Sequence, residues 1–330
     1  MSTPAETILA GGPRLRTAVI GVGYLGRFHA EKYAANPAAE LVAVADVDPA
    51  RARAVAAALG VEAVTDYRAL AGRIDCASVA VPTQLHHAVA CDLLDAGVDV
   101  LVEKPLTTTV DEGKALLELA VRRGRVLQVG HLERFNPAIR ALDGIVREPR
   151  FIECHRLAPF TERGTDVDVV LDLMIHDLDV ILSMMPSPLR SVEAVGVPVL
   201  TPQVDIASAR LRFANGCIAN VTASRVSLKR ERKLRIFQED AYLSVDYGER
   251  RVLICRREMG ADGQPSLSVE EHDVPDVDPL ESEIDAFLRA VRERERPPVS
   301  GWEGLRALEV AHLILESLET EVQAVQAAGR

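Results

Sequence analysis

Asp172 and His176 lie four residues apart in the segment DVVLDLMIHDLDVIL. On a helix this spacing places both side chains on one face. Since most residues around them are apolar, we expect a buried helix, in which a carboxylate is costly unless it is paired or functional. His176 could act as a general base, with Asp172 orienting its imidazole and stabilising the charged form. A buried hydrogen-bonded pair with only a structural role is the alternative.

Lys104 stands between Glu103 and Pro105, directly after an apolar stretch that is typical of a strand. This is an unusual position for a solvated surface lysine. Close to a substrate hydroxyl, its cation could stabilise alkoxide character as hydride leaves. A surface ion pair between Glu103 and Lys104 is the alternative.

A glycine-rich turn, GVGYLG, joins an expected strand to an expected helix. Gly21 permits a tight turn, Gly23 lets the backbone approach a pyrophosphate, and Gly26 lets the helix and strand pack closely. Unpaired N–H groups at the start of the helix would favour an anion. We expect a dinucleotide to contact Gly21, Gly23, Tyr24, Leu25 and Gly26, and a purely structural turn is the alternative.

Asp46 ends the next expected strand, twenty residues after Gly26, where a ribose-binding carboxylate is expected. It would accept hydrogen bonds from both hydroxyls of the adenosine ribose and repel a 2′-phosphate. This favours NAD over NADP as the cofactor, while Arg51 and Arg53 are near enough to leave NADP open.

Two further strand ends are expected to meet the cofactor, because a dinucleotide crosses the carboxyl ends of a doubly wound sheet. One is the VPT segment that precedes His86, and the other is the EKP segment. A proline that simply opens a helix, with His86 in its first turn, is the alternative for the first. The further cofactor contacts that we expect come from Val81, Pro82, Thr83, His86, Glu103 and Lys104.

A basic run, KRERKLR, occupies residues 229–235 of an otherwise acidic chain. With Arg225 nearby, it could meet the phosphates of a nucleotide-linked substrate. A solvated strand edge or turn is the alternative.

The elements that position these residues show two rhythms. From Arg16, Val-rich apolar stretches alternate with segments of helical spacing that often end in glycine. This alternation predicts an α/β fold, with an N-terminal Rossmann domain of doubly wound parallel sheet at residues 15–131. Residues 1–14 are expected to form a flexible tail. The expected strands are TAVIGVG, ELVAVADV, CASVAVP, DVLVEKP and VLQVGH.

Residues 132–330 predict a second, α+β domain with an open, mostly antiparallel sheet, which binds substrate and carries oligomer contacts. A helix at about 167–185 precedes several strand-like stretches, and Asn215-Gly216 marks a hairpin between two of them. Residues 259–280 are expected to form a loop, followed by a helix that starts at Asp278-Pro279. A last helix, 300–326, starts with a capping box of Ser300 and Glu303 and could pack back on the Rossmann domain.

Composition excludes several classes. The 330 residues carry 38 Lys and Arg against 49 Asp and Glu, a net charge of −11, which disfavours nucleic-acid binding. No apolar run is long enough for a membrane span, and the first residues do not resemble a signal peptide. The 5 cysteines contain no CxxC pair, which disfavours disulfides and zinc. We expect a cytoplasmic protein with no metal, nucleic acid or membrane partner.

Taken in order, GxGxxG, Asp46, VPT, EKP and DxxxH resemble the Gfo/Idh/MocA family of sugar and polyol dehydrogenases, from about residue 16 to about 325. The resemblance implies an NAD(P)-dependent enzyme with a Rossmann domain and an open-faced sheet domain that carries dimer contacts. It also implies catalytic roles for Lys104, Asp172 and His176. Many members have a run of glycines before DxxxH, where this chain reads DVDVV at 166–170, so a generic sugar specificity does not follow.

Three stretches are similar to a narrower group, the bacterial UDP-N-acetylglucosamine 3-dehydrogenases: residues 130–137, 155–179 and 224–238. The similarity implies NAD-dependent oxidation of a sugar C3 hydroxyl to a 3-keto nucleotide sugar, which an aminotransferase converts for lipid A synthesis. The substrate contacts that this implies, besides the three catalytic residues, are Arg134, Asn136, Arg163 and Arg225.

Other activities stay open at this stage. Within the family, the alternatives are enzymes that oxidise a UDP-uronic acid, a free sugar or inositol. Outside enzymes, the alternative is an NAD-sensing regulatory protein, although such a protein has no use for a proton-transfer set. We expect the substrate at the seam with the second domain, and a homodimer or homotetramer assembled through the open sheet.

Overall fold

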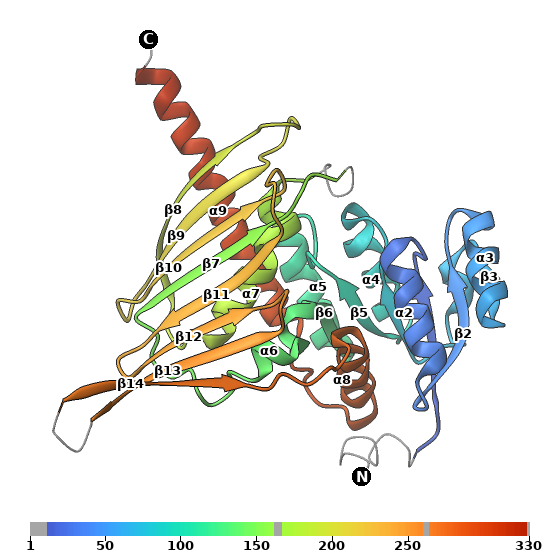
Figure 1. Cartoon of the computed structure of the whole chain (residues 1–330). Helices are drawn as coiled ribbons and strands as arrows, with labels where there is room; N and C mark the ends of the chain where they lie inside the picture. The colour runs from blue at the N-terminus through green and yellow to red at the C-terminus, as the bar shows by residue number, and fades with distance from the viewer. Residues whose placement is uncertain (1–11, 162–166, 260–263, 329–330) are drawn as a thin grey trace. The chain divides into compact units, whose positions relative to one another are not determined.

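The computed structural model describes residues 12–161, 167–259 and 264–328, with side chains up to residue 320. Two compact units make up the chain. The Rossmann unit comprises Met1–Leu132 and Asp278–Leu305, and the sheet unit comprises Glu133–Val277 and Arg306–Arg330. Figure 1 shows both units along the chain.

The Rossmann unit contains a six-stranded parallel sheet in the order β3-β2-β1-β4-β5-β6. This confirms the predicted doubly wound sheet. Its strands are β1 (Leu15–Ile20), β2 (Ala39–Ala45), β3 (Glu62–Val64), β4 (Cys76–Val79), β5 (Asp99–Glu103) and β6 (Leu127–Gly130). Its helices are α2 (Tyr24–Ala35), α3 (Pro49–Leu59), α4 (His86–Asp95), α5 (Val110–Arg123) and α8 (Pro279–Glu293), with short 3-10 turns η1 (Tyr67–Leu70) and η2 (Thr83–Leu85). The 3-10 turn η3 (Leu132–Phe135) starts at the last residue of this part of the unit and continues into the sheet unit.

Local sequence signals explain where these helices begin and end. Asp48 caps α3 by accepting the N–H groups of Ala50 and Arg51. Thr109 and Glu112 form a capping box at the start of α5. Gly124 ends α5 in the left-handed conformation that glycine adopts most readily.

Helix α8 belongs to the Rossmann unit, whereas the sequence placed everything after residue 131 in the second domain. Its buried side chains share one apolar core with β1, α2 and β2. Because these side chains fill the Rossmann core, the chain belongs to the Rossmann unit again after residue 277, where the last strand of the sheet unit has ended. The contributing residues of α8 are Ile284, Phe287, Leu288, Ala290 and Val291.

The sheet unit contains eight strands in the order β14-β13-β12-β11-β7-β10-β9-β8. Among the described strands of this sheet, only β7 and β10 pair in parallel, and the other neighbours pair antiparallel. This confirms the prediction of a mostly antiparallel sheet. The strands are β7 (Phe151–Leu157), β8 (Leu189–Val197), β9 (Ile206–Phe213), β10 (Ile218–Ser224), β11 (Glu231–Phe237), β12 (Ala241–Asp246), β13 (Arg251–Met259) and β14 (Pro265–His272). The helices are α6 (Pro137–Arg140), the π-helical turn η4 (Val170–Met174), α7 (Ile175–Met184) and α9 (Gly301–Ala328), whose first turn lies in the Rossmann unit.

The sheet has one covered and one open face. Along β7, β9 and β10, fully buried residues alternate with half-buried ones. The buried set packs against α6, α7 and the part of α9 in the sheet unit. This alternation is what a sheet with helices on one face requires.

One predicted element was wrong. Residues 259–280 do not form only a loop, because Pro265–His272 pair with β13 as the edge strand β14. Its side chains are mostly exposed, so the strand gains its stability from backbone pairing. Leu267 and Val269 are its only alternating apolar residues, which is too short a pattern to predict a strand. By contrast, the predicted start signals at Asp278-Pro279 and at Ser300 with Glu303 are confirmed, as is the Asn215-Gly216 hairpin. Among the described residues, no helix is long and apolar enough to cross a membrane.

Candidate active site

The glycine-rich turn between β1 and α2 has the geometry that its sequence predicts. Gly21 has a φ of 84°, and a Cβ there would lie 2.6 Å from the Ala80 carbonyl oxygen. A Cβ on Gly26 would lie 1.8 Å from the Gly21 oxygen. Side chains at these two positions would therefore push the helix and the strands apart.

Gly23 is the N-cap of α2 and has a different environment. Apart from the adjacent backbone of the same turn and helix, no described atom lies within 4 Å of the place where its Cβ would stand. No side chain caps α2, and its first turn contains no acidic residue. The helix start thus combines free space with N–H donors and a positive dipole end, which fits the pyrophosphate of a dinucleotide. The neighbouring Tyr24 and Leu25 are exposed.

Asp46, directly after β2, is held against this turn. It is 8% exposed, and its carboxylate accepts the N–H of Val22 at 2.9 Å and of Asp48 at 2.9 Å. Arg51 Nη1 lies 3.3 Å from both carboxylate oxygens. The carboxylate is therefore fixed in the place where the ribose of a dinucleotide is expected, with one cation beside it.

His86 lies inside the protein, although the sequence suggested that it contacts the cofactor. Its ring is 1% exposed and lies 2.8 Å from the Pro105 oxygen and 2.9 Å from the Val81 oxygen. Burial lowers the pKa of His86, which keeps the ring neutral. His86 thus lies between backbone oxygens of the VPT segment and of the EKP segment. Pro82 is exposed, and Val81 and Thr83 are half-buried.

A buried hydrogen-bond chain positions the EKP segment, and no sequence motif predicts it. His29 of α2 is 1% exposed, and its Nε2 donates to Glu103 Oε1 at 2.9 Å. Glu103 Oε2 accepts the Lys104 backbone N–H at 3.2 Å. Burial would raise the pKa of Glu103, but the His29 contact outweighs it, and the pKa is lowered. On the other side, His29 Nδ1 lies 3.1 Å from Ser78 Oγ.

Glu283 of α8 completes a group of three possible ligands. One ligand atom each of His29, Glu103 and Glu283 lies within 4.8 Å of the others. His29 and Glu103 already share a hydrogen bond there. The expectation that the protein needs no metal stays a prediction.

Asp172 and His176 lie across a change of helix type. Asp172 is in the π-helical turn η4, and His176 is in the first turn of α7. Both side chains are half-buried, whereas Met174 and Ile175 between them are fully buried. Single π turns inside helices are frequent at functional sites.

A buried ion cluster lies next to this pair in the sheet unit. Arg156 is 4% exposed and donates to Asp177 at 2.7 and 2.8 Å and to Glu133 at 2.9 Å. Both carboxylates raise the pKa of Arg156 against the effect of burial. Through Arg156 of strand β7, the cluster links Asp177, which directly follows His176, to Glu133.

The predicted substrate residues have protein partners of their own. Asn136 caps α6 through Ala138 and donates to Glu133 at 3.0 Å. Arg134 lies 3.6 Å from Asp179, with 21% of its side chain exposed. Arg225 is 4% exposed and donates to the Val167 oxygen at 2.6 Å. Arg163 lies outside the described residues.

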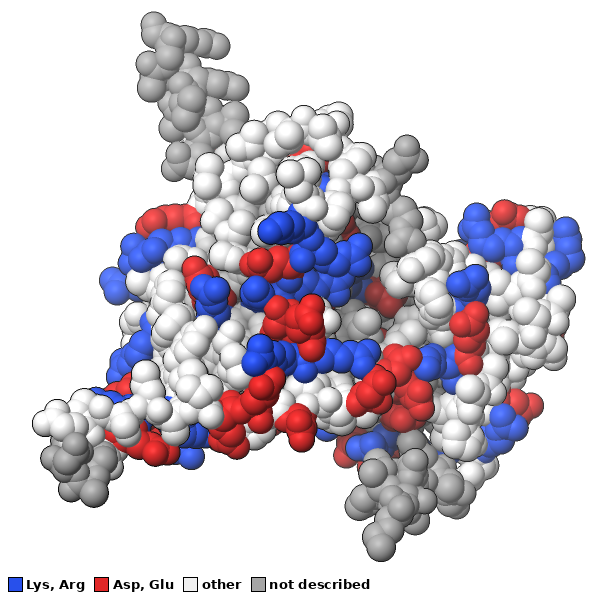
Figure 2. Space-filling view, in the orientation of Figure 1, with Lys and Arg blue, Asp and Glu red and all other residues white. Residues whose placement is uncertain are grey.

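The basic run 229–235 does not form one basic surface. Lys229 and Arg230 are exposed before β11 begins. Along β11, Lys233 pairs with Asp246 and Arg235 pairs with Glu153. Figure 2 accordingly shows basic and acidic side chains interspersed over the visible face.

Comparison with known proteins identifies both parts of the chain. Residues 15–131 match the Gfo/Idh/MocA oxidoreductase family, NAD-binding Rossmann fold, and residues 138–244 match the Gfo/Idh/MocA C-terminal domain. The UDP-N-acetylglucosamine 3-dehydrogenase of Acidithiobacillus ferrooxidans is 41% identical over 94% of this chain and 99% of its own. The scyllo-inositol 2-dehydrogenase (NAD(+)) of Bacillus subtilis is 31% identical over 65% of this chain and 68% of its own.

Solved structures agree with these matches. The structure of the Acidithiobacillus ferrooxidans enzyme has a TM-score of 0.88 at 40% identity, covering 94% of this chain and 99% of that one. A levoglucosan dehydrogenase in complex with NADH shares the fold, with a TM-score of 0.84 at 19% identity over 93% of this chain and 98% of that one. With a near-full-length relative at this identity and both domains matched, the chain belongs to the Gfo/Idh/MocA family of NAD-binding oxidoreductases.

Proposed function

We propose that this protein is an NAD-dependent dehydrogenase that oxidises the C3 hydroxyl of UDP-N-acetylglucosamine to the 3-keto nucleotide sugar. The observation that carries the proposal is the relation to the UDP-N-acetylglucosamine 3-dehydrogenase of Acidithiobacillus ferrooxidans, which extends over 94% of this chain. The three stretches that resemble this group, 130–137, 155–179 and 224–238, all lie in or next to the unit expected to bind substrate.

The Rossmann unit holds the cofactor, and NAD when bound supplies the hydride acceptor. The start of α2 binds the pyrophosphate, because Gly23 leaves room for it and the helix dipole favours an anion. Asp46 binds the adenosine ribose hydroxyls. Val81, Pro82 and Thr83 line the next part of the cofactor path.

Three side chains carry out the chemistry on the substrate hydroxyl. Lys104 stabilises the negative charge that develops on the oxygen as hydride leaves. His176 removes the hydroxyl proton, and Asp172 holds the imidazole in the useful tautomer. Lys104 belongs to the Rossmann unit, and Asp172 and His176 belong to the sheet unit.

The substrate diphosphate needs cations that protein carboxylates do not already occupy. Lys229 and Arg230 are exposed at the start of the basic run. We assign them, with Arg163, to the diphosphate, whereas Arg134 already lies 3.6 Å from the Asp179 carboxylate. Asn136 already uses its amide within α6 and with Glu133, which favours a structural role for it.

A screen of substrates tests the proposal. Purified protein with NAD is mixed with UDP-N-acetylglucosamine, UDP-uronic acids, free N-acetylglucosamine and inositol, and NADH is followed by absorbance. The proposal expects turnover with the UDP-amino sugar and little with free sugars. Turnover on inositol alone would support the second candidate, which the similarity to scyllo-inositol 2-dehydrogenase favours. Tight NAD binding without turnover on any substrate would point to an NAD sensor.

Lys104→Ala tests the catalytic assignment within that reaction. The variant should keep its affinity for NADH but lose roughly 100-fold or more in kcat, because a well-placed charge acts in the transition state. Steady-state kinetics and NADH titration measure the two effects. A variant with the wild-type kcat would leave Lys104 a merely structural role.

The setting of the reaction extends the proposal. We place the enzyme in the cytoplasm, ahead of an aminotransferase that acts on the 3-keto sugar for lipid A synthesis. We also propose a homodimer or homotetramer that assembles through the open face of the sheet unit. Light scattering of the purified protein measures the assembly directly.

A further inference from the structure

Asp205 is a fully buried carboxylate that closes the loop between β8 and β9. It is 0% exposed, and Oδ2 accepts three successive backbone N–H groups, from Val199 at 2.8 Å, Leu200 at 2.6 Å and Thr201 at 2.8 Å. The Thr201 hydroxyl donates to Oδ1 at 2.7 Å. Burial would raise the pKa of Asp205, but these hydrogen bonds outweigh it and hold the pKa at about 2. The carboxylate therefore stays charged and the loop stays closed.

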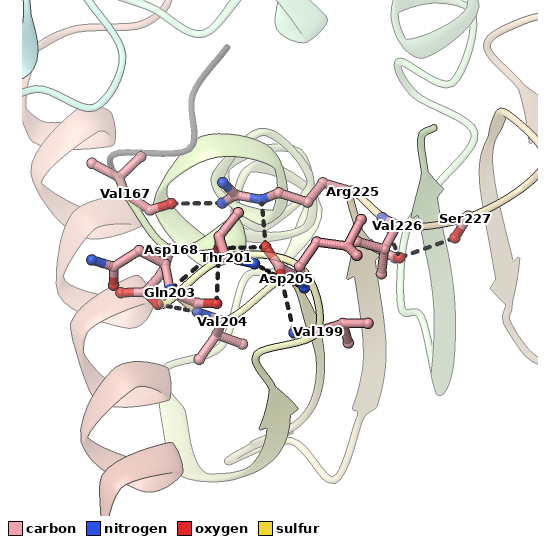
Figure 3. A network of polar contacts seen from close by, with 12 residues as sticks. Val167, Asp168, Val199, Thr201, Gln203, Val204, Asp205, Arg225, Val226 and Ser227 are labelled. Carbon is pink, nitrogen blue, oxygen red and sulfur yellow. Dashed lines mark hydrogen bonds and ion pairs between the residues drawn. The ribbon is translucent and has the colours of Figure 1, made fainter. Parts of the chain in front are cut away.

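Arg225 links this loop to Val167, which precedes the π-helical turn η4 that contains Asp172, as Figure 3 shows for Arg225 and Val167. It follows β10 directly, and antiparallel pairing of β9 with β10 brings it beside Asp205. Its backbone N–H donates to the backbone carbonyl oxygen of Asp205 at 2.9 Å, and its side-chain Nε lies 3.9 Å from the carboxylate oxygen Oδ1 of Asp205. Its Nη2 donates to the Val167 oxygen at 2.6 Å. One guanidinium thus bridges two strand ends and the chain that enters the helix.

A second connection runs between the same two segments. Val204 N–H donates to Asp168 Oδ1 at 2.8 Å, and Val169 N–H donates to the Val204 oxygen at 2.9 Å. The Asp168 oxygen in turn accepts the Asp172 N–H at 3.0 Å. Val167 is therefore held by Arg225, whereas Asp168 and Val169 are held by Val204 of the Asp205 loop. The π turn starts directly after these three residues.

We propose that Asp205 and Arg225 are positioning residues, which fix residues 167–169 and thereby aim the turn that carries Asp172 and His176. This inference rests on the proposed function, since it assigns these two residues to the same reaction. It also gives Arg225 a different role from the phosphate contact that the sequence suggested. A buried guanidinium that donates to a backbone carbonyl and lies beside a buried carboxylate acts through the protein, not on the substrate.

Arg225→Lys is the central variant, because it keeps the charge but loses the second nitrogen that reaches Val167. Asp205→Asn is its partner. Arg212→Lys on β9 is the matched control, because the Arg212 side chain is 42% exposed and its ion pair within the described part of the chain is with Glu193. At saturating UDP-N-acetylglucosamine, Arg225→Lys and Asp205→Asn should lose about 10- to 100-fold in kcat, since a displacement of about 1 Å costs on that order. The KM and the affinities for NADH and UDP should change less than about threefold.

Histidine NMR provides a readout that does not depend on turnover. The His176 imidazole resonances, assigned with His176→Gln, should move in both variants and stay in place in Arg212→Lys. Thr201→Val removes only one hydroxyl from Asp205, so it tests the loop if Asp205→Asn fails to fold. A smaller shift in the same direction is expected from it.

Two results would overturn the inference. Folded Arg225→Lys with unchanged kcat and unchanged His176 resonances would show that the pair does not position the turn. A raised KM and weaker UDP binding at constant kcat would assign Arg225 to the phosphates instead. If wild-type protein does not oxidise UDP-N-acetylglucosamine, the proposed function fails, and the NMR comparison still decides whether Arg225 and Asp205 aim the turn.

Discussion

We propose that the choice between NAD and NADP depends most on Asp46. Asp46→Ala should weaken NADH binding by about 10-fold or more, because each hydrogen bond to a charged group contributes roughly 1.5–3 kcal/mol. It should also narrow the preference over NADPH, since the repulsion of a 2′-phosphate disappears and Arg51 stays nearby. Fluorescence titration of both cofactors measures the change. An unchanged preference would remove Asp46 from cofactor selection.

His176 should determine the acid side of the pH–rate profile. A neutral imidazole is needed to accept the hydroxyl proton, so kcat/KM should fall as the ring protonates. Asp172→Asn removes the negative charge that favours the imidazolium, so the acid limb should move to lower pH while the rate falls. The profile is recorded with NAD saturating, for wild type and variant. An acid limb that stays in place in Asp172→Asn and in His176→Ala would mean that another group is the base.

Residues that act through local sequence could be predicted, and residues that act across the fold could not. The glycines of the GVGYLG turn, Asp46 and Lys104 can be selected from the sequence because they belong to motifs or follow strands. The His29–Glu103 hydrogen bond joins residues 74 positions apart, and the sequence around His29 does not indicate that Glu103 is its partner. Arg156 and Asp205 were missed for the same reason. Arg225 was noticed for its charge, but its burial decides what it contacts, and burial follows from strand pairing.

At the scale of elements, apolar strands and capped helices were predictable because their signals are local. Thr109 with Glu112, and Ser300 with Glu303, mark helix starts by direct hydrogen bonds. The edge strand β14 gave no such signal, because backbone pairing with β13 needs no apolar side chain. The π-helical turn at 170–174 also could not be predicted, since a helical pattern in the sequence does not distinguish π from α geometry.

Gly26 and Gly23 form a matched pair of tests for helix α2. Gly26→Ala should lower stability and NADH affinity together, because its Cβ would lie 1.8 Å from the Gly21 oxygen, and overpacking costs about 1–3 kcal/mol or more. Gly23→Ala should leave stability almost unchanged but weaken NADH binding, because its Cβ enters only the free space beside the helix start. Thermal unfolding and NADH titration separate the two effects. Equal loss of stability in both variants would contradict these separate roles.

At the scale of the whole molecule, the Rossmann unit is built from two separate parts of the chain. Residues 278–305 supply α8, and Phe287 and Leu288 are fully buried in the core that they share with Val19 and Tyr33. A fragment of residues 1–132 should therefore fail to fold stably. The same fragment joined by a short linker to residues 278–305 should fold and bind NADH. Circular dichroism and NADH titration distinguish the two, and cooperative unfolding of the shorter fragment would show that α8 is dispensable.

This discontinuity constrains the order of events on the ribosome. The first 132 residues leave the exit tunnel long before Phe287 and Leu288 are translated, and they do so without the side chains that complete their core. At roughly 5–20 residues per second, the stretch in between takes on the order of ten seconds to make. During that interval the apolar surface around Val19 and Tyr33 lacks the side chains of α8, and we expect chaperones to bind the nascent chain there. We likewise expect cofactor binding only near the end of synthesis, after most of the sheet unit has emerged.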